Sequence, residues 1–122
     1  MKSPIRILIV EDEMLTALAL EMELKHAGYV VCNNVVSGEE AVASAARDHP
    51  DVILMDIRLV GELDGIEAAQ RIQAAAPIPI IFMTAYKDET LTERVQQLKP
   101  LGYLSKPVSP HVLKPIFEAA FP

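Results

Sequence analysis

Several features are scarce in this 122-residue chain, and each scarcity excludes a class of protein. It has one cysteine, Cys32, so no disulfide can form within the chain, and we expect Cys32 to be a buried strand residue. No apolar run approaches the roughly 20 residues that a membrane-spanning helix needs. Basic residues are outnumbered, 11 against 17 acidic ones, and a net charge of −6 argues against direct nucleic-acid binding, which requires a basic surface.

Length and composition instead predict a folded, soluble domain. A chain that is 51% hydrophobic and 23% charged is unlike a disordered segment, and 122 residues suffice for one ordinary core. The chain begins Met1-Lys2-Ser3-Pro4 and enters an apolar run without the regions of an export signal, which predicts a cytoplasmic protein. We expect a single domain over residues 1–122, with no output domain present.

Five short apolar runs have the character of buried strands. They are Ile5–Val10, Val30–Asn33, Val52–Met55, Ile80–Met83 and Tyr103–Leu104. Continuous apolar runs, rather than alternating ones, are typical of parallel strands covered on both faces. A stretch of helical period follows each run. The pattern predicts an α/β fold, a flavodoxin-like doubly wound sheet of five parallel strands in the order 2-1-3-4-5, built as (βα)5.

The helical stretches carry recognisable ends. The first, over residues 14–27, has an apolar face of Met14, Leu15, Leu18 and Met22 and is followed by Gly28 as a C-terminal cap. The later helices are expected to begin at Ser37, Asp64, Asp88 and Ser109. Pro115 lies inside the last helix, where it removes one backbone hydrogen bond and predicts a kink.

Polar side chains follow four of the predicted strands. Glu11 and Asp12 follow the first strand, Asp56 the third, Thr84 the fourth and Lys106 the fifth. The carboxyl ends of parallel strands meet at one edge of the sheet, so these side chains are expected to lie together. Crowded carboxylates repel one another, and Mg²⁺ relieves that repulsion while also accepting a phosphoryl oxygen. A carboxylate beside a metal, an ammonium and a hydroxyl can form an acyl phosphate.

Taken in order, these motifs resemble the receiver domain of bacterial two-component response regulators, and the similarity runs from about Ile5 to Phe121. The resemblance rests on five motifs at strand ends: Glu11-Asp12, Asp56, Thr84-Ala85, Tyr103 three residues before Lys106, and Lys106-Pro107. It implies a signalling switch, not an enzyme that acts on other molecules, because a receiver catalyses only its own phosphorylation and dephosphorylation.

The resemblance implies a role for each residue of the site. Asp56 would accept a phosphoryl group from a sensor histidine kinase or a histidine phosphotransfer protein. Glu11, Asp12, Asp56 and the backbone carbonyl of Arg58 would bind Mg²⁺. The structural change caused by phosphorylation would be read by a downstream protein target or a fused domain, or would promote pairing of two copies of the chain.

Further residues concern the switch and its lifetime. In the family, the residues that match Thr84 and Lys106 bind the phosphoryl group, and the aromatic that matches Tyr103 swings inward when the threonine moves. The face made by the fourth helix, fifth strand and fifth helix then changes. Arg58 and Tyr86 lie two residues after Asp56 and Thr84, and large side chains there are expected to hinder an attacking water and slow self-dephosphorylation.

The loop after Asp56 departs from the family pattern. Val60 stands where receivers commonly have a proline, and Asp64-Gly65 falls one residue late. We read Asp64 as a helix cap, not a metal ligand, and we expect Gly61 to absorb the extra residue at a positive φ. Arg58 precedes the insertion, so the metal site is expected to survive.

Two other functional classes share parts of this pattern. A phosphatase of the haloacid dehalogenase type also uses a strand-end aspartate and Mg²⁺, but it requires Asp-x-Asp, and here Asp56-Ile57-Arg58 places a cation at the third position. A nucleotide or flavin module requires a glycine-rich phosphate loop or a dinucleotide fingerprint, and the sequence has neither. Turnover of a phosphomonoester would reveal the first class, and cofactor absorption bands a flavin.

Overall fold

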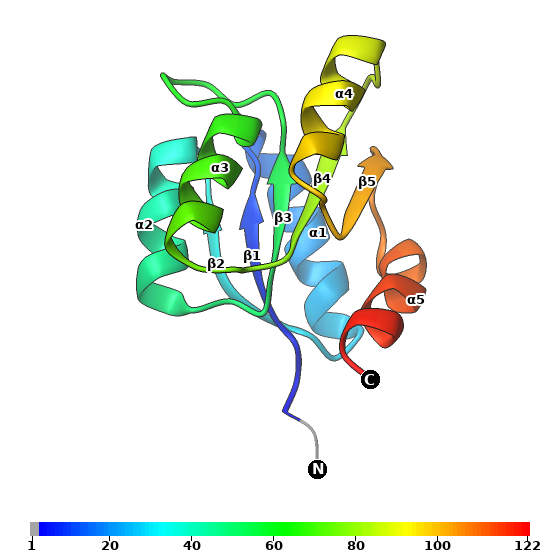
Figure 1. Ribbon diagram of the computed structural model, residues 1–122. Helices are drawn as coiled ribbons and strands as arrows, with labels where there is room; N and C mark the ends of the chain where they lie inside the picture. The colour runs from blue at the N-terminus through cyan, green and yellow to red at the C-terminus, as the bar shows by residue number, and fades with distance from the viewer. Residues whose placement is uncertain (1–2) are drawn as a thin grey trace.

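The predicted architecture is confirmed by the computed structural model, which describes residues 3–122, so that Met1 and Lys2 lie outside the described residues. The strands are β1 (Arg6–Val10), β2 (Val30–Val35), β3 (Val52–Asp56), β4 (Ile80–Thr84) and β5 (Gly102–Ser105). The helices are α1 (Met14–His26), α2 (Gly38–Asp48), α3 (Gly65–Ala75), α4 (Glu89–Gln97) and α5 (Pro110–Ala120). Within residues 3–122 the strands form one parallel sheet in the order β2-β1-β3-β4-β5, the flavodoxin-like arrangement (Figure 1).

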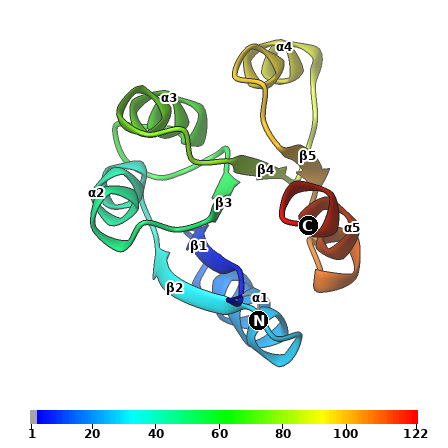
Figure 2. The ribbon, with the colours of Figure 1, turned by 60° about the horizontal axis from the view of Figure 1, so that its bottom comes forward.

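Helices cover both faces of the sheet, as the continuous apolar strands require. Viewed along the sheet, α1 and α5 lie on one side, and α2, α3 and α4 lie on the other (Figure 2). Alternate residues of β1 point to opposite faces of the sheet. Ile7 and Ile9 pack with α1 and α5, whereas Leu8 and Val10 pack with α2 and α3. All four of these side chains are buried, so β1 contributes to the hydrophobic clusters on both faces of the sheet.

The prediction for the apolar face of α1 is wrong. Met14, Leu15, Leu18 and Met22 are exposed, with relative exposures of 70%, 84%, 47% and 72%. The buried side of α1 consists of Ala17, Leu20 and Leu24 instead. Apolar residues occur around most of this helix, so periodicity alone cannot select the face that meets the sheet. The consequence is an apolar stripe on the outer surface of α1, defined by these four exposed residues.

The predicted helix starts agree with the structure, with one difference. The side chains of Ser37, Asp64 and Asp88 accept hydrogen bonds from backbone N–H groups in the first turns of α2, α3 and α4. Ser109 stands before α5 without a side-chain cap bond, and α5 continues through Pro115 to Ala120. No helix in the described part of the chain is long and apolar enough to cross a membrane.

The edge strand β2 differs from its prediction in length and burial. It continues past Asn33 to Val35, and its pairing with β1 shifts register between Ile7 and Leu8. Cys32 lies at that shift and is half-buried, not buried, because the outer edge of β2 has no neighbouring strand among residues 3–122. Its thiol donates a hydrogen bond to the carbonyl of Ile7 (Sγ to O, 3.4 Å), and burial raises the pKa of Cys32.

Candidate functional site

The strand register places the polar strand ends at one edge of the sheet. Val10 of β1 pairs with Met55 of β3, and Thr84 of β4 pairs with Ser105 of β5. The residues that follow these pairs therefore emerge at similar heights. This is the edge beyond the carboxyl ends of the strands, where ligands bind in open α/β sheets.

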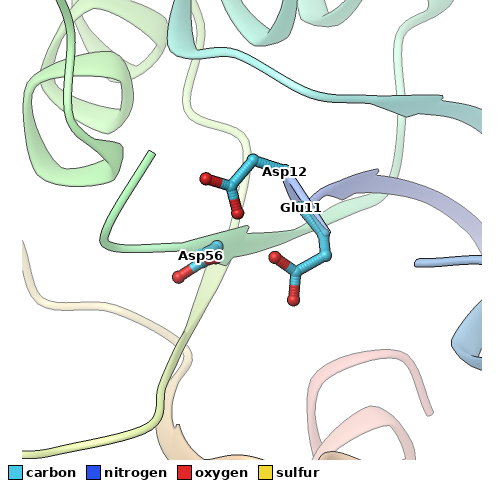
Figure 3. Close-up of side chains that lie close together, drawn as sticks. All are labelled: Glu11, Asp12 and Asp56. Carbon is cyan, nitrogen blue, oxygen red and sulfur yellow. The ribbon is translucent and has the colours of Figure 1, made fainter. Parts of the chain in front are cut away.

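Glu11, Asp12 and Asp56 gather into an acidic cluster at this edge. One carboxylate oxygen from each residue lies within 4.8 Å of the other two, and the three side chains lie close together in Figure 3. Glu11 is 1% exposed and Asp56 is 4% exposed, whereas Asp12 is half-buried. Two nearly buried carboxylates and a third beside them form a site of strong negative potential that favours a bound cation.

Lys106 supplies a positive charge to this cluster. Its ammonium donates hydrogen bonds to Oε1 of Glu11 (2.6 Å) and to Oδ2 of Asp56 (3.0 Å). Burial by itself would lower the pKa of Lys106, but the bonds to the two carboxylates outweigh it and raise the pKa. The lysine is therefore firmly charged at neutral pH, and it reaches the site from a position 95 residues after Glu11.

The charge balance of the cluster remains negative. Burial raises the pKa of Glu11, the adjacent Asp56 raises it further, and Lys106 opposes both effects. Counted as formal charges, one ammonium does not compensate three carboxylates. A divalent cation would supply the missing charge, and the all-oxygen donor set fits Mg²⁺.

Backbone groups fix the orientation of the two buried carboxylates. The N–H of Arg58 donates to Oδ1 of Asp56 (3.2 Å), and the N–H of Glu13 donates to Oε2 of Glu11 (3.3 Å). Neither contact was predicted, because each depends on the conformation of the loop after its strand. Asp56 is thereby held on both oxygens, by Arg58 on one and by Lys106 on the other.

Sequence reasoning treated Gly65 only as part of a helix cap and missed its packing role. The N–H of Gly65 donates to the carbonyl of Ile57 (2.8 Å), and a Cβ at this position would overlap the carbonyl oxygen of Asp56. The cap itself is confirmed, because Asp64 and Glu67 form a reciprocal capping box. The one signal in the sequence for this contact was that receiver domains commonly have an acidic residue followed by glycine near this position.

Thr84 lies at the end of β4, and its hydroxyl is engaged with the backbone of the loop that follows. Its side chain is buried, and its hydroxyl donates to the carbonyl of Tyr86 (3.0 Å) while accepting from the N–H of Tyr86 (3.3 Å). Tyr103, the expected switch residue, is half-buried and packs against the cluster that contains Val95 of α4. Thr84 is thus bound to the loop of residues 85–88, the β4–α4 segment, and Tyr103 packs against the cluster to which α4 contributes.

Arg58 and Tyr86 follow Asp56 and Thr84 by two residues, and both are exposed. The Arg58 guanidinium lies 3.8 Å from Oδ2 of Asp88, the N-cap residue of α4, and Tyr86 is 78% exposed. The loop between Arg58 and α3 contains Gly61 at φ +112°, which confirms the predicted positive φ. Because Glu39 of α2 accepts a hydrogen bond from the N–H of Leu63 (3.0 Å), this longer loop is anchored.

The sequence matches the family described as the response regulator receiver domain over residues 7–118. The chain belongs to the receiver domain family. The transcriptional regulatory protein PdtaR of Mycobacterium tuberculosis is 37% identical to it over 117 residues, which cover 96% of the chain but 57% of PdtaR. The receiver domain therefore spans little more than half the length of this curated relative.

Solved structures of receiver domains are similar in fold and sequence. The receiver domain of a modulated diguanylate cyclase from Desulfovibrio desulfuricans is 42% identical, with a TM-score of 0.90, and the match covers 97% of this chain and 94% of that one. The response regulator domain of Thermotoga maritima CheB is 28% identical, with a TM-score of 0.85 and 96% of each chain covered. This receiver domain thus has an acidic pocket of Glu11, Asp12 and Asp56 that is typical of a phosphoacceptor site.

Proposed function

We propose that the protein is a cytoplasmic signalling switch that accepts a phosphoryl group on Asp56 in a Mg²⁺-dependent reaction. The observation that carries the proposal is the position of Asp56, which is almost buried, lies in the acidic cluster and is bound by Lys106. Membership of the receiver family supports a two-component histidine kinase, directly or through a histidine phosphotransfer protein, as the donor.

The chemistry follows from the groups around Asp56. An oxygen of its carboxylate attacks the phosphorus of the donor, a new O–P bond forms, and the bond from phosphorus to the donor atom breaks with its electron pair leaving on the donor. Mg²⁺ held by Glu11, Asp12, Asp56 and the carbonyl of Arg58 would neutralise charge on the transferring phosphoryl oxygens. The two hydrogen bonds on Asp56 hold its carboxylate in one orientation for attack.

Lys106 and Thr84 are the proposed phosphoryl ligands. Lys106 already contacts Asp56, so its ammonium needs little movement to bind an added phosphoryl oxygen. Thr84 must rotate or shift, because its hydroxyl is engaged with Tyr86. Releasing that bond would change the β4–α4 segment and, through Tyr103, the face formed by α4, β5 and α5. A preference of a few kcal/mol suffices to invert such a two-state equilibrium.

The apolar stripe of α1 supports a docking surface for the phosphodonor. α1 begins at Met14, two residues after Asp12, so the stripe starts beside the acidic cluster. Its most exposed member, Leu15, is 84% exposed. Contiguous exposed apolar side chains on a folded domain commonly mark an interaction site. A helical donor protein packed on this stripe would have its phosphohistidine near Asp56.

The output of the switch is proposed to pass through the face formed by α4, β5 and α5. PdtaR is named a transcriptional regulatory protein, and this chain spans 57% of that relative. A downstream protein target or a fused domain is therefore proposed to read the α4, β5 and α5 face, and phosphorylation-linked pairing of two chains is a second route. Nucleic acid is not proposed as a direct ligand, because the net charge is −6.

Intact-mass measurement after incubation with acetyl phosphate tests the phosphoacceptor proposal. The wild-type chain is expected to gain one phosphoryl group with Mg²⁺ and none with EDTA. Asp56→Asn should gain none, whereas Asp51→Asn, at the opposite end of β3, should behave as wild type. Equal labelling of wild type and Asp56→Asn would reject the proposal.

A further inference from the structure

Tyr103 of β5 is held in an unusual environment for a tyrosine. Its hydroxyl is buried and has no hydrogen-bond partner among residues 3–122. Its ring packs beside the core cluster that includes Val95, and the residue as a whole is half-buried. A buried hydroxyl without a partner is unfavourable, so other contacts must stabilise this position of the ring.

Lys87 provides those contacts from the β4–α4 segment. Its ammonium donates a hydrogen bond to the backbone carbonyl of Tyr103 (Nζ to O, 2.8 Å). The same nitrogen lies 4.5 Å from the centroid of the Tyr103 ring, within the range of a cation–π interaction. One cation therefore contacts both the main chain and the aromatic face of Tyr103.

Lys87 is also close in the chain to the residue expected to sense phosphorylation. The Thr84 hydroxyl donates a hydrogen bond to the carbonyl of Tyr86, the neighbour of Lys87, and accepts one from the N–H of Tyr86. Asp88, the other neighbour, caps α4 by accepting from the N–H of Leu91 (2.8 Å). Thr84 and Tyr103 thus both contact the residues between β4 and α4, Thr84 through the backbone of Tyr86 and Tyr103 through the side chain of Lys87.

We propose that Lys87 is a positioning residue that holds Tyr103 against the core and couples it to the β4–α4 segment. The holding role depends only on the two observed contacts. The coupling role rests on the proposed function, because it requires Thr84 to respond to a phosphoryl group on Asp56. Nothing in the motifs that identify the family assigns a role to this lysine, whose partner is 16 residues later in the chain.

Nitration of the full chain by tetranitromethane, mapped by mass spectrometry, tests the holding role. In the wild type, Tyr103 should react slowly, while Tyr86, at 78% exposed, reports that the reagent is active. Lys87→Met removes the charge at similar length, and Tyr103 nitration should become about fivefold faster, the change that corresponds to about 1 kcal/mol. Lys87→Arg keeps a cation and donors, and should restore slow reaction.

Lys114→Met is the matched control, because Lys114 is an exposed lysine of α5 that forms an ion pair with Glu118. It should leave Tyr103 nitration as in the wild type. Unchanged nitration in Lys87→Met, or equal acceleration in Lys87→Arg and Lys87→Met, would overturn the holding role.

Ring resonances of tyrosine-labelled protein, recorded with and without beryllofluoride and Mg²⁺, test the coupling role. The Tyr103 signal should shift in the wild type, and the shift should shrink at least twofold in Lys87→Met. An equal shift in both proteins would overturn the coupling. If neither the Tyr86 nor the Tyr103 signal of the wild type changes, the proposed function fails, while the nitration result still decides the holding role.

Discussion

Gly65 at the start of α3 lies directly against the backbone of Asp56, so closely that a Cβ on residue 65 would overlap the carbonyl oxygen of Asp56 and lie 2.9 Å from the Cα of Ile57. The first turn of α3 therefore contacts the main chain of the proposed phosphoacceptor. This relationship explains why a glycine follows the cap residue Asp64, and it makes the geometry of Asp56 dependent on a second element of the fold.

Gly65→Ala is expected to destabilise the protein by about 1–3 kcal/mol, because α3 or the end of β3 must move to relieve the overlap. The same movement should slow phosphorylation of Asp56. Urea unfolding followed by circular dichroism measures the first effect. Gly28→Ala is the control: its φ of +99° is also unfavourable for alanine, yet no atom lies within 4 Å of the added Cβ. Equal labelling rates for wild type and Gly65→Ala would contradict the proposed link to Asp56.

Arg58 and Tyr86 are expected to protect a phosphoryl group on Asp56 from water. Arg58→Ala and Tyr86→Ala should each accelerate dephosphorylation by about three- to tenfold, which corresponds to about 1 kcal/mol in activation free energy. The decay of labelled protein after removal of acetyl phosphate gives the rate. Arg94→Ala is the control, because it removes an arginine whose guanidinium contacts Asp64 (3.2 Å) and not Asp88. Unchanged decay in both test variants would exclude the shielding idea.

Leu15→Glu and Met22→Glu test the apolar stripe of α1 as the docking surface of the phosphodonor. Both side chains are largely exposed, so stability should change by no more than about 0.5 kcal/mol. Phosphotransfer from a protein donor should fall about tenfold, the equivalent of about 1.4 kcal/mol, while labelling by acetyl phosphate stays the same. Val30→Glu, an exposed apolar site at the start of β2, is the control. Unaltered transfer from the donor to both α1 variants would show that the donor docks on another surface.

Asp48 at the end of α2 makes an acid-sensitive contribution to stability. The Arg47 guanidinium first, and then the Ser44 hydroxyl, lower the pKa of Asp48 from 3.8 to about 2. A carboxyl group whose pKa is lower in the folded state stabilises the fold above its unfolded pKa, and this stabilisation is lost as the pH falls through the folded value. Asp48→Asn should therefore be less stable than wild type at pH 7, with the difference shrinking between about pH 4 and pH 2. A constant difference across that range in urea unfolding would contradict the assignment.

Much of the fold could be predicted because it follows from local patterns. Continuous apolar strands, capping residues such as Asp64 and Asp88, and short connections together specify a parallel sheet covered on both faces. The acidic cluster could be predicted for the same reason, since strand ends in a parallel sheet share an edge. In both cases a residue's position along the chain was sufficient to place it in space.

The remaining features depend on contacts between distant or flexible groups. The buried face of α1 was predicted wrongly because Leu18 and Leu20 are equally apolar, and only packing against the sheet distinguishes them. The direction of the Thr84 hydroxyl depends on the conformation of the loop that contains Tyr86. The contact of Lys87 with Tyr103 joins two elements, and no short motif records it.

The central claim is that Asp56 is the residue that carries the phosphoryl group. Reduction with borohydride after incubation with acetyl phosphate and Mg²⁺ converts an aspartyl phosphate to the corresponding alcohol, which peptide mapping by tandem mass spectrometry assigns to one residue. The account predicts a modified side chain at position 56 and an unmodified Asp12 and Asp51 in the same sample. Modification at any other residue, with position 56 intact, would contradict it.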